Sequence, residues 1–261
     1  MQQRFRYLSL AVAGLLFGLM ATVAISPAGH VGAQGEQTTK TFDVEAFTSI
    51  QINGGGSATL TFGDTPSVSI SGNSLVVDRL DASVEDGRLV VGSLATVVTD
   101  PVSDLTYEIV TPSIEEIHLS GTVNLEVASM PAQPSLVIGL TTGAHLNIPA
   151  MAVDSLTGKL DLDSRAVLGG TADTMELEVN NNSELDATEL QVRSADMVLN
   201  GSSQATVRVT EALTGRAAQN SSVTYITETV TPDVSTTTMA EVREQEFTPW
   251  VAPEGMATPA A

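Results

Sequence analysis

Short segments in which apolar and polar residues alternate fill the chain from residue 42 to residue 227. Val, Ile, Leu and Thr dominate these segments, and Gly, Asn, Asp and Pro separate them. Alternation with a period of two predicts strands that bury one face, and the separating residues predict turns. No stretch beyond the first 33 residues shows a sustained helical period. We therefore predict an all-β domain over residues 42–227.

Six segments in the second part of this domain align as repeats. Two columns of the alignment are apolar, and a column of small residues lies between them. The first apolar column contains Leu119, Leu140, Leu162, Val179, Leu199 and Ala218, and the second contains Leu125, Leu146, Leu168, Leu185, Ala205 and Thr224. The small-residue column contains Val123, Ala144, Ala166, Ser183, Ser203 and Ser222. Members of the first column are separated by 21, 22, 17, 20 and 19 residues.

A unit of about 20 residues cannot bury its own apolar face, so such units are stable only when they stack. The aligned columns predict a right-handed parallel β-helix-like solenoid with rungs of about 20 residues. A β-sandwich would also contain alternating strands, but it does not require columns at a nearly constant period. A polar column predicts the corners, where Gly and Asn tolerate a left-handed backbone. Its members are Ser120, Thr141, Asp163, Asn180, Asn200 and Gln219.

Residues 42–110 predict a section rich in β-hairpins at the N-terminal side of the stack. Two strand patterns, 47–52 and 58–62, flank the sequence Asn53-Gly54-Gly55-Gly56. Residues 63–66 predict a turn, and Asp86-Gly87 predicts a tight hairpin. We expect this section to cover the open edge of the first rung.

The two ends of the chain differ from the domain between them. Residues 1–33 combine two arginines, an apolar run from Leu8 to Ile25 and a small-residue stretch. This pattern predicts an export signal cleaved before Gln34, or alternatively an uncleaved N-terminal membrane anchor. Residues 228–261 are rich in Thr, Pro, Ala and Glu and predict a disordered tail. Phe247 and Trp250 in that tail are interpreted as a lone aromatic pair, with a short docking motif as the alternative.

Composition excludes several classes of protein. The chain has 261 residues, no cysteine, 4% aromatic residues and a formal net charge of −20. The lack of cysteine excludes disulfide scaffolds, thiolate metal sites and cysteine nucleophiles. The acidic excess argues against nucleic acid as a partner, since phosphate binding requires a basic face. A narrow aliphatic stack also explains the scarcity of aromatic residues.

Four motifs in order resemble the putative auto-transporter adhesin, head GIN domain family. They are the strand Phe47 to Ile52, the step Gly63-Asp64 with Ser67 to Ile70, the turn Asp86 to Leu89, and the segment Pro112 to Gly121 with its Ser-Gly corner. The resemblance covers residues 42–227. It implies an exported β-helical domain with an adhesin function, and it carries over no catalytic residues.

Candidate chemistry is sparse along the chain. His30 lies in the predicted signal, and His118 and His145 are predicted on outward positions of different columns, so we expect no shared metal site. Three carboxylate pairs, Asp161 with Asp163, Glu176 with Glu178, and Glu184 with Asp186, are predicted on outward faces. They leave a weak calcium site open as an alternative to a solvated acidic face. We assign no catalytic, cofactor-binding or metal-binding residue, and no cofactor.

These observations predict a non-enzymatic exported β-helix that acts as an adhesin or as an interaction module of the cell envelope. We expect an extracytoplasmic location, secreted or at the cell surface, with cell-surface or cell-wall components as partners. Contact with a membrane is expected only through an uncleaved N-terminal anchor. The alternatives are a polysaccharide-active β-helix enzyme and a weak calcium-binding surface protein. The ligand and the oligomeric state stay open.

Overall fold

The computed structural model describes residues 36–93 and 105–252, so the predicted signal or anchor at residues 1–33 lies outside the described residues. The first part of the fold contains β1 (Gln37–Phe42), β2 (Ser49–Phe62), β3 (Ser67–Asn73), the short helix α1 (Ser74–Val77), β4 (Leu80–Glu85), β5 (Arg88–Ser93), β6 (Thr106–Thr111) and β7 (Glu116–Val127). The second part contains β8 (Gln133–Thr141), β9 (His145–Leu160), β10 (Arg165–Val179), β11 (Glu184–Leu199), β12 (Gln204–Ala217), β13 (Ser222–Ile226), β14 (Asp233–Thr236) and β15 (Glu241–Glu244). Within the described ranges, no helix is long and apolar enough to cross a membrane.

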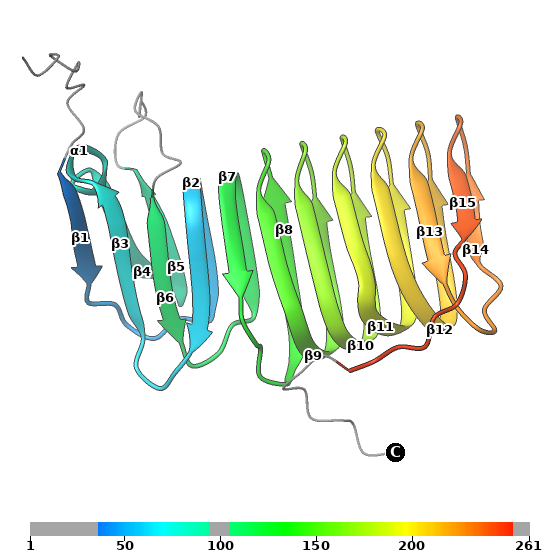
Figure 1. Cartoon of the computed structure of the whole chain (residues 1–261), viewed down its shortest axis with the longest axis horizontal. Helices are drawn as coiled ribbons and strands as arrows, with labels where there is room; N and C mark the ends of the chain where they lie inside the picture. Colours follow the sequence, from blue (N-terminus) through cyan, green and yellow to red (C-terminus); the bar gives the residue numbers. More distant parts are fainter. Residues whose placement is uncertain (1–35, 94–104, 253–261) are drawn as a thin grey trace, which may run out of the picture. The chain divides into compact units, whose positions relative to one another are not determined.

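Successive strands from β7 to β13 pair in parallel, each with the next one along the chain (Figure 1). The first coil is set by β2, which also runs parallel to β7. Stacked in this way, the strands form a β-solenoid of about six coils with a period of about 20 residues. Leu, Ile, Val and Ala from alternate positions fill one continuous core inside the coils. The predicted fold class is confirmed.

The register confirms most of the predicted columns and corrects two coils. In the first apolar column, the aligned residues are Leu119, Leu140, Leu160, Val179, Leu199 and Ala217. In the second, they are Leu125, Leu146, Ala166, Leu185, Ala205 and Val223. The predicted members Leu162, Leu168, Ala218 and Thr224 were therefore wrong. Leu162 is 48% exposed and has a φ of 54°, because it lies in a corner rather than in a strand.

The small-residue column consists of buried serines in the later coils, where Ser164 and Ser221 replace the wrongly predicted members Ala166 and Ser222. Ser164, Ser183, Ser203 and Ser221 are each at most 1% exposed. Their hydroxyls bond to the chain at the corners. Ser164 Oγ donates to the carbonyl of Asp161 at 2.6 Å, and Ser203 Oγ donates to the carbonyl of Val179 at 2.7 Å. A buried hydroxyl needs such a partner. Because these bonds supply one, the serine side chains can be buried at the corners without leaving an unsatisfied polar group.

Side chains of neighbouring coils form hydrogen-bond ladders at these corners. The register confirms Ser120 with Thr141 and Asn180 with Asn200 in the predicted polar column, but Asp163 and Gln219 were wrong members, since Asp161 and Ala218 occupy the aligned positions. Asn200 Nδ2 donates to Asn180 Oδ1 at 3.0 Å, and Asn182 Nδ2 donates to Asp163 Oδ1 at 2.6 Å. Asn182 and Asp163 have φ values of 65° and 63°, which place both in the left-handed region. Asn and Asp tolerate this conformation better than other residues with a side chain, which explains their repeated use here.

The N-terminal section confirms the predicted turns and hairpins. β4 and β5 pair antiparallel around Asp86 and Gly87, and β3 pairs antiparallel with β1 and with β6. Residues 53–56 do not separate two strands, because β2 runs through them as one strand that pairs with β7 from Ser49 to Leu60. A Cβ at Gly121 of β7 would lie 2.0 Å from the carbonyl oxygen of Gly54. The glycines thus allow two coils to stay paired through a bend, rather than forming a loop.

Residues 228–252 contain two paired strands, which corrects the prediction of a disordered tail for this part, and residues 253–261 of the predicted tail lie outside the described residues. β14 pairs in parallel with β12, and β15 pairs in parallel with β13. Thr238 and Met239 between them have φ values of 53° and 59°, so the corner geometry of the earlier coils is repeated. The hydrophobic pattern did not predict this last coil because its strands contain few apolar residues. They are held by backbone hydrogen bonds and bury little surface.

Candidate functional site

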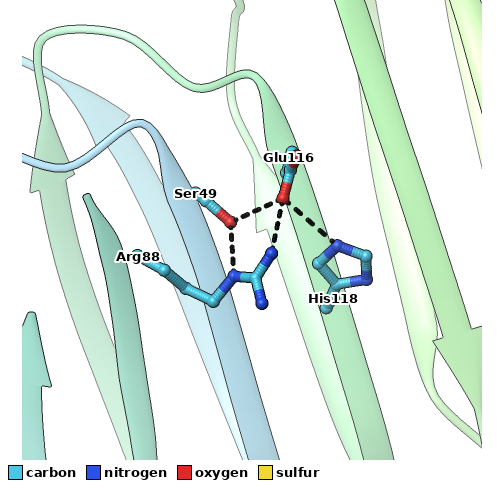
Figure 2. Close-up of polar contacts among 4 residues, drawn as sticks. All are labelled: Ser49, Arg88, Glu116 and His118. Atoms are coloured by element: carbon cyan, nitrogen blue, oxygen red, sulfur yellow. Dashed lines mark hydrogen bonds and ion pairs between the residues drawn. The ribbon is translucent and has the colours of Figure 1, made fainter. Parts of the chain in front are cut away.

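A cluster of four polar side chains lies on the outward face of β2, β5 and β7. Arg88, Ser49 and Glu116 occupy aligned positions on these three strands. Arg88 Nη2 donates to Glu116 Oε2 at 2.8 Å, and Arg88 Nε donates to Ser49 Oγ at 3.1 Å. Ser49 Oγ donates to Glu116 Oε2 at 3.1 Å, and His118 Nε2 lies 3.5 Å from the same oxygen (Figure 2).

The carboxylate of Glu116 is the centre of this cluster. Hydrogen bonds from Arg88 and Ser49 lower the pKa of Glu116 below its ordinary value, because they stabilise the charged form. The side chain of Glu116 is 38% exposed and that of Arg88 is 43% exposed, so water screens the pair. The cluster is therefore a surface network with fixed geometry rather than a buried charge.

The contacts of Ser49 differ from those of a catalytic serine. A serine nucleophile is activated when its hydroxyl donates to a general base that is oriented by a third group. Here the hydroxyl donates to a carboxylate that already accepts from Arg88, and it accepts from the same guanidinium. Ser49 is also only 7% exposed. The arrangement holds Arg88 and Glu116 in place, and presents their remaining donors and acceptors at the surface.

A hollow of about 410 Å³ lies beside this cluster on the same face. It is lined by residues from β2, β5, β7, β8 and β9 and from the corner after β9: Gln51, Asn53, Arg88, His118, Leu119, Ser120, Gly139, Leu140, Thr141, Lys159 and Asp161. His118, Gly139 and Lys159 occupy aligned positions on β7, β8 and β9. A Cβ at Gly139 would lie 2.5 Å from His118 Nδ1, so the missing side chain leaves room for the imidazole and for the hollow.

The two histidines predicted on outward positions lie on different strands and in different rows. His118 is aligned with Gly139, whereas His145 is aligned with Asn124 and Arg165. The predicted separation is confirmed. Among the described residues, no group of three or more His, Asp or Glu side chains is arranged to hold a metal ion.

The three predicted carboxylate pairs have different surroundings. Asp161 and Asp163 lie at a corner and not on a strand face, which corrects their predicted position, and they accept hydrogen bonds from Asn181 and Asn182. Glu178 lies 3.4 Å from Lys159, and Glu184 lies 2.7 Å from Arg165. Glu176 is aligned with Asp196. Asp161, Asp163, Glu178 and Glu184 thus each have a side-chain partner in a neighbouring coil, whereas Glu176 lies beside another carboxylate and Asp186 accepts from the backbone amide of Thr188 in its own coil.

Residues 245–252 pack against the solenoid near β12, an arrangement that the sequence did not predict. Arg208 of β12 is 3% exposed, and its guanidinium donates to the carbonyl and to Oγ1 of Thr248. Trp250 Nε1 donates to the carbonyl of Glu189 at 3.0 Å. We call residues 245–252 the strap. Phe247 and Trp250 line a hollow of about 320 Å³ beside β12, so this aromatic pair lies against the solenoid of its own chain.

Sequence reasoning missed Arg88, Glu116 and the strap. Arg88 and Glu116 lie 28 residues apart on strands that do not follow one another along the chain. Each looks like an ordinary charged residue on the outward side of a strand. The one sequence signal for the hollow was Gly139. A glycine inside a strand pattern indicates that another backbone lies close to the strand or that the surface is left open there.

Comparison with known proteins relates this chain to a family and to several solved structures. The model of the family described as "Putative auto-transporter adhesin, head GIN domain" matches residues 46–228. A putative adhesin from Bacteroides fragilis has a similar structure, with 15% identity, a TM-score of 0.72, and coverage of 80% of this chain and 97% of that one. A putative lipid binding protein from Parabacteroides distasonis is similar at 13% identity and a TM-score of 0.61, over 81% of this chain and 97% of that one. At these identities the likeness shows a common fold. No curated protein matches the chain.

Proposed function

Because the chain belongs to the putative auto-transporter adhesin, head GIN domain family, we propose that it is a non-enzymatic surface-binding module of the cell envelope. The single observation that carries this proposal is the outward face formed by β2, β7, β8 and β9. Its polar side chains project from the strands of successive coils, and neighbouring strands are about 4.8 Å apart. A strand scaffold holds such groups more firmly than loops do.

The geometry suits an extended ligand. Each coil repeats the outward positions at the same spacing, and the aligned residues Asn53, Ser120 and Thr141 offer a polymer lying across the strands a hydrogen-bonding group at each of three coils. The hollow of about 410 Å³ is within the size range of pockets that hold small molecules, and it opens on this face. Both properties favour binding to a polymer of the cell surface or the cell wall over turnover of a small substrate.

We place the protein outside the cytoplasm. The apolar run at residues 8–25 follows two arginines, as in an export signal or an N-terminal anchor, and an adhesin acts at a cell surface. Fractionation of expressing cells tests this location. Recovery of the chain in the culture medium or with the envelope is expected, and recovery only with cytoplasmic proteins would contradict the proposal.

Retention on surfaces tests the function itself. Purified protein is labelled and incubated with isolated cell walls and with intact cells, and bound protein is measured after washing. We expect saturable retention that unlabelled protein displaces, while heat-unfolded protein serves as the control. Retention no greater than that of the unfolded control on every surface would overturn the proposed function. Incubation with the same wall material should release no soluble fragments, since the module is proposed to bind without turnover.

A further inference from the structure

The two cationic side chains that line the hollow are each paired with a carboxylate, and its one lining carboxylate accepts from neutral donors. Arg88 bonds Glu116 at 2.8 Å, and Lys159 lies 3.4 Å from Glu178. Asp161 accepts from Asn181 Nδ2 at 2.6 Å and from the backbone amide of Leu162 at 3.0 Å. The whole chain also carries a net charge of −20. An anionic ligand would meet Asp161 and Glu116 as well as the cations, so the hollow offers it little net attraction.

The same side chains provide many donors and acceptors. A guanidinium has five N–H groups, and the bonds of Arg88 within the described residues use only Nε and Nη2. Gln51 and Asn53 each carry an amide that donates and accepts, and Ser120 carries a hydroxyl that does both. Neutral ligands with several adjacent hydroxyls need this mixture, because each hydroxyl both donates and accepts.

The shape of the hollow depends on one position. Gly139 lies between His118 and Lys159 in an aligned row, so the two long side chains stand about two strand spacings, roughly 10 Å, apart. The gap between them has backbone as its floor. Gly139 has no left-handed φ, so its backbone does not require glycine, and what the residue provides is space. The imidazole of His118 leans over Gly139, so the space that remains for a ring lies between this imidazole and Lys159.

We propose that this hollow is a binding site for a neutral sugar residue within a glycan chain. The proposal rests on the proposed surface-binding function and names its ligand class. The imidazole of His118 and the side chain of Lys159 flank the ring, and the hydroxyls of Ser120 and Thr141 bond it from the next outward positions of β7 and β8. The amides of Gln51 and Asn53, on the far side of β7, bond the neighbouring sugar residue of the chain. Neighbouring sugar residues of the glycan lie on the same outward face, across the strands of the adjacent coils.

Oligosaccharide binding to the full-length chain tests the ligand class. The probes are cellohexaose, chitohexaose and mannohexaose as neutral chains and hexagalacturonate as the anionic chain, each measured by calorimetry. We expect at least one neutral probe to bind more tightly than the anionic one. Stronger binding of hexagalacturonate, or no binding of any neutral probe by protein that is retained on cell walls, would overturn the proposal. Loss of wall retention itself would instead overturn the proposed function.

Variants of the lining test the location. Gly139→Val fills the gap, and Gln51→Ala removes one amide without a steric change; each should weaken binding of the neutral probe about tenfold. Gln204→Ala is the matched control, since Gln204 is an exposed glutamine on β12 outside the hollow. Glu178→Gln removes the partner of Lys159 and should leave the affinity for the neutral probe unchanged. Unchanged affinity in both lining variants, with melting temperatures equal to that of the wild type, would place the sugar elsewhere.

Discussion

Arg208 on β12 bonds both the carbonyl and the hydroxyl of Thr248, a residue 40 positions further along the chain. The guanidinium also donates to the carbonyl of Thr188 at 2.9 Å. One buried side chain therefore connects two coils with the strap. Without it, the strap would keep, among the hydrogen bonds of the described residues, the bond of Trp250 to Glu189 and the backbone bond of Gln245 to Tyr225.

Arg208→Ala should release the strap and destabilise the protein by about 2 kcal/mol, because three carbonyl or hydroxyl partners lose a charged donor. Trp250 is the single tryptophan of the chain, so its fluorescence reports on the strap alone. We expect a red shift of emission before global unfolding and faster proteolysis within residues 245–252. Arg216→Ala on the exposed side of the same strand is the control and should change stability by less than about 0.5 kcal/mol. Equal emission spectra for both variants would contradict the anchoring role.

Gly170→Ala should destabilise the protein strongly. A Cβ there would lie 2.0 Å from the carbonyl oxygen of Met151 in the preceding coil, and the φ of 116° is unfavourable for alanine. Gly87→Ala separates the two effects, since Gly87 has a φ of 75° but no atom within 4 Å of its added Cβ. We expect a loss of about 1 kcal/mol for Gly87→Ala and of more than about 3 kcal/mol for Gly170→Ala in urea unfolding. Similar losses would show that coil contact at Gly170 is unimportant.

Asn182→Ala should cost about 1–2 kcal/mol, since it removes the bond to Asp163 and places alanine at a φ of 65°. Asn182→Gly removes the same bond but relieves the backbone, so its loss should be smaller. The difference between the two melting temperatures measures the conformational part. A glycine variant less stable than the alanine variant would show that backbone preference does not govern this corner.

Arg88→Met should alter the pH dependence of stability. The lowered pKa of Glu116 means that the folded protein favours the carboxylate, so this contribution is present above the ordinary pKa of glutamate. The stabilisation by the Arg88–Glu116 pair is lost as the pH falls through the lowered pKa of Glu116 in the folded state. Since both side chains are more than a third exposed, we expect only about 0.5 kcal/mol at neutral pH. Chemical unfolding at several pH values should show the difference between variant and wild type shrinking in acid, and a constant difference would contradict it.

Several features followed from local pattern alone. The turn at residues 63–66 and the hairpin at Asp86 and Gly87 were predicted because turns depend on a few adjacent residues. The pairing of Leu119 with Leu140 and of Val179 with Leu199 followed from the period. The error at Leu162 has a physical reason: alternation places leucine at both 160 and 162, and the pattern does not say which one starts the corner.

The sequence by itself determined the all-β class, the coil length of about 20 residues and the polar corners, because each repeats along the chain and repetition survives without coordinates. The tertiary structure alone decided the contacts that occur only once and do not repeat from coil to coil. The bond of Arg88 to Glu116, the hollow over Gly139 and the strap held by Arg208 join residues from separate coils. Which outward residues meet depends on the register of paired strands, and a shift of one residue would move each side chain to the opposite face.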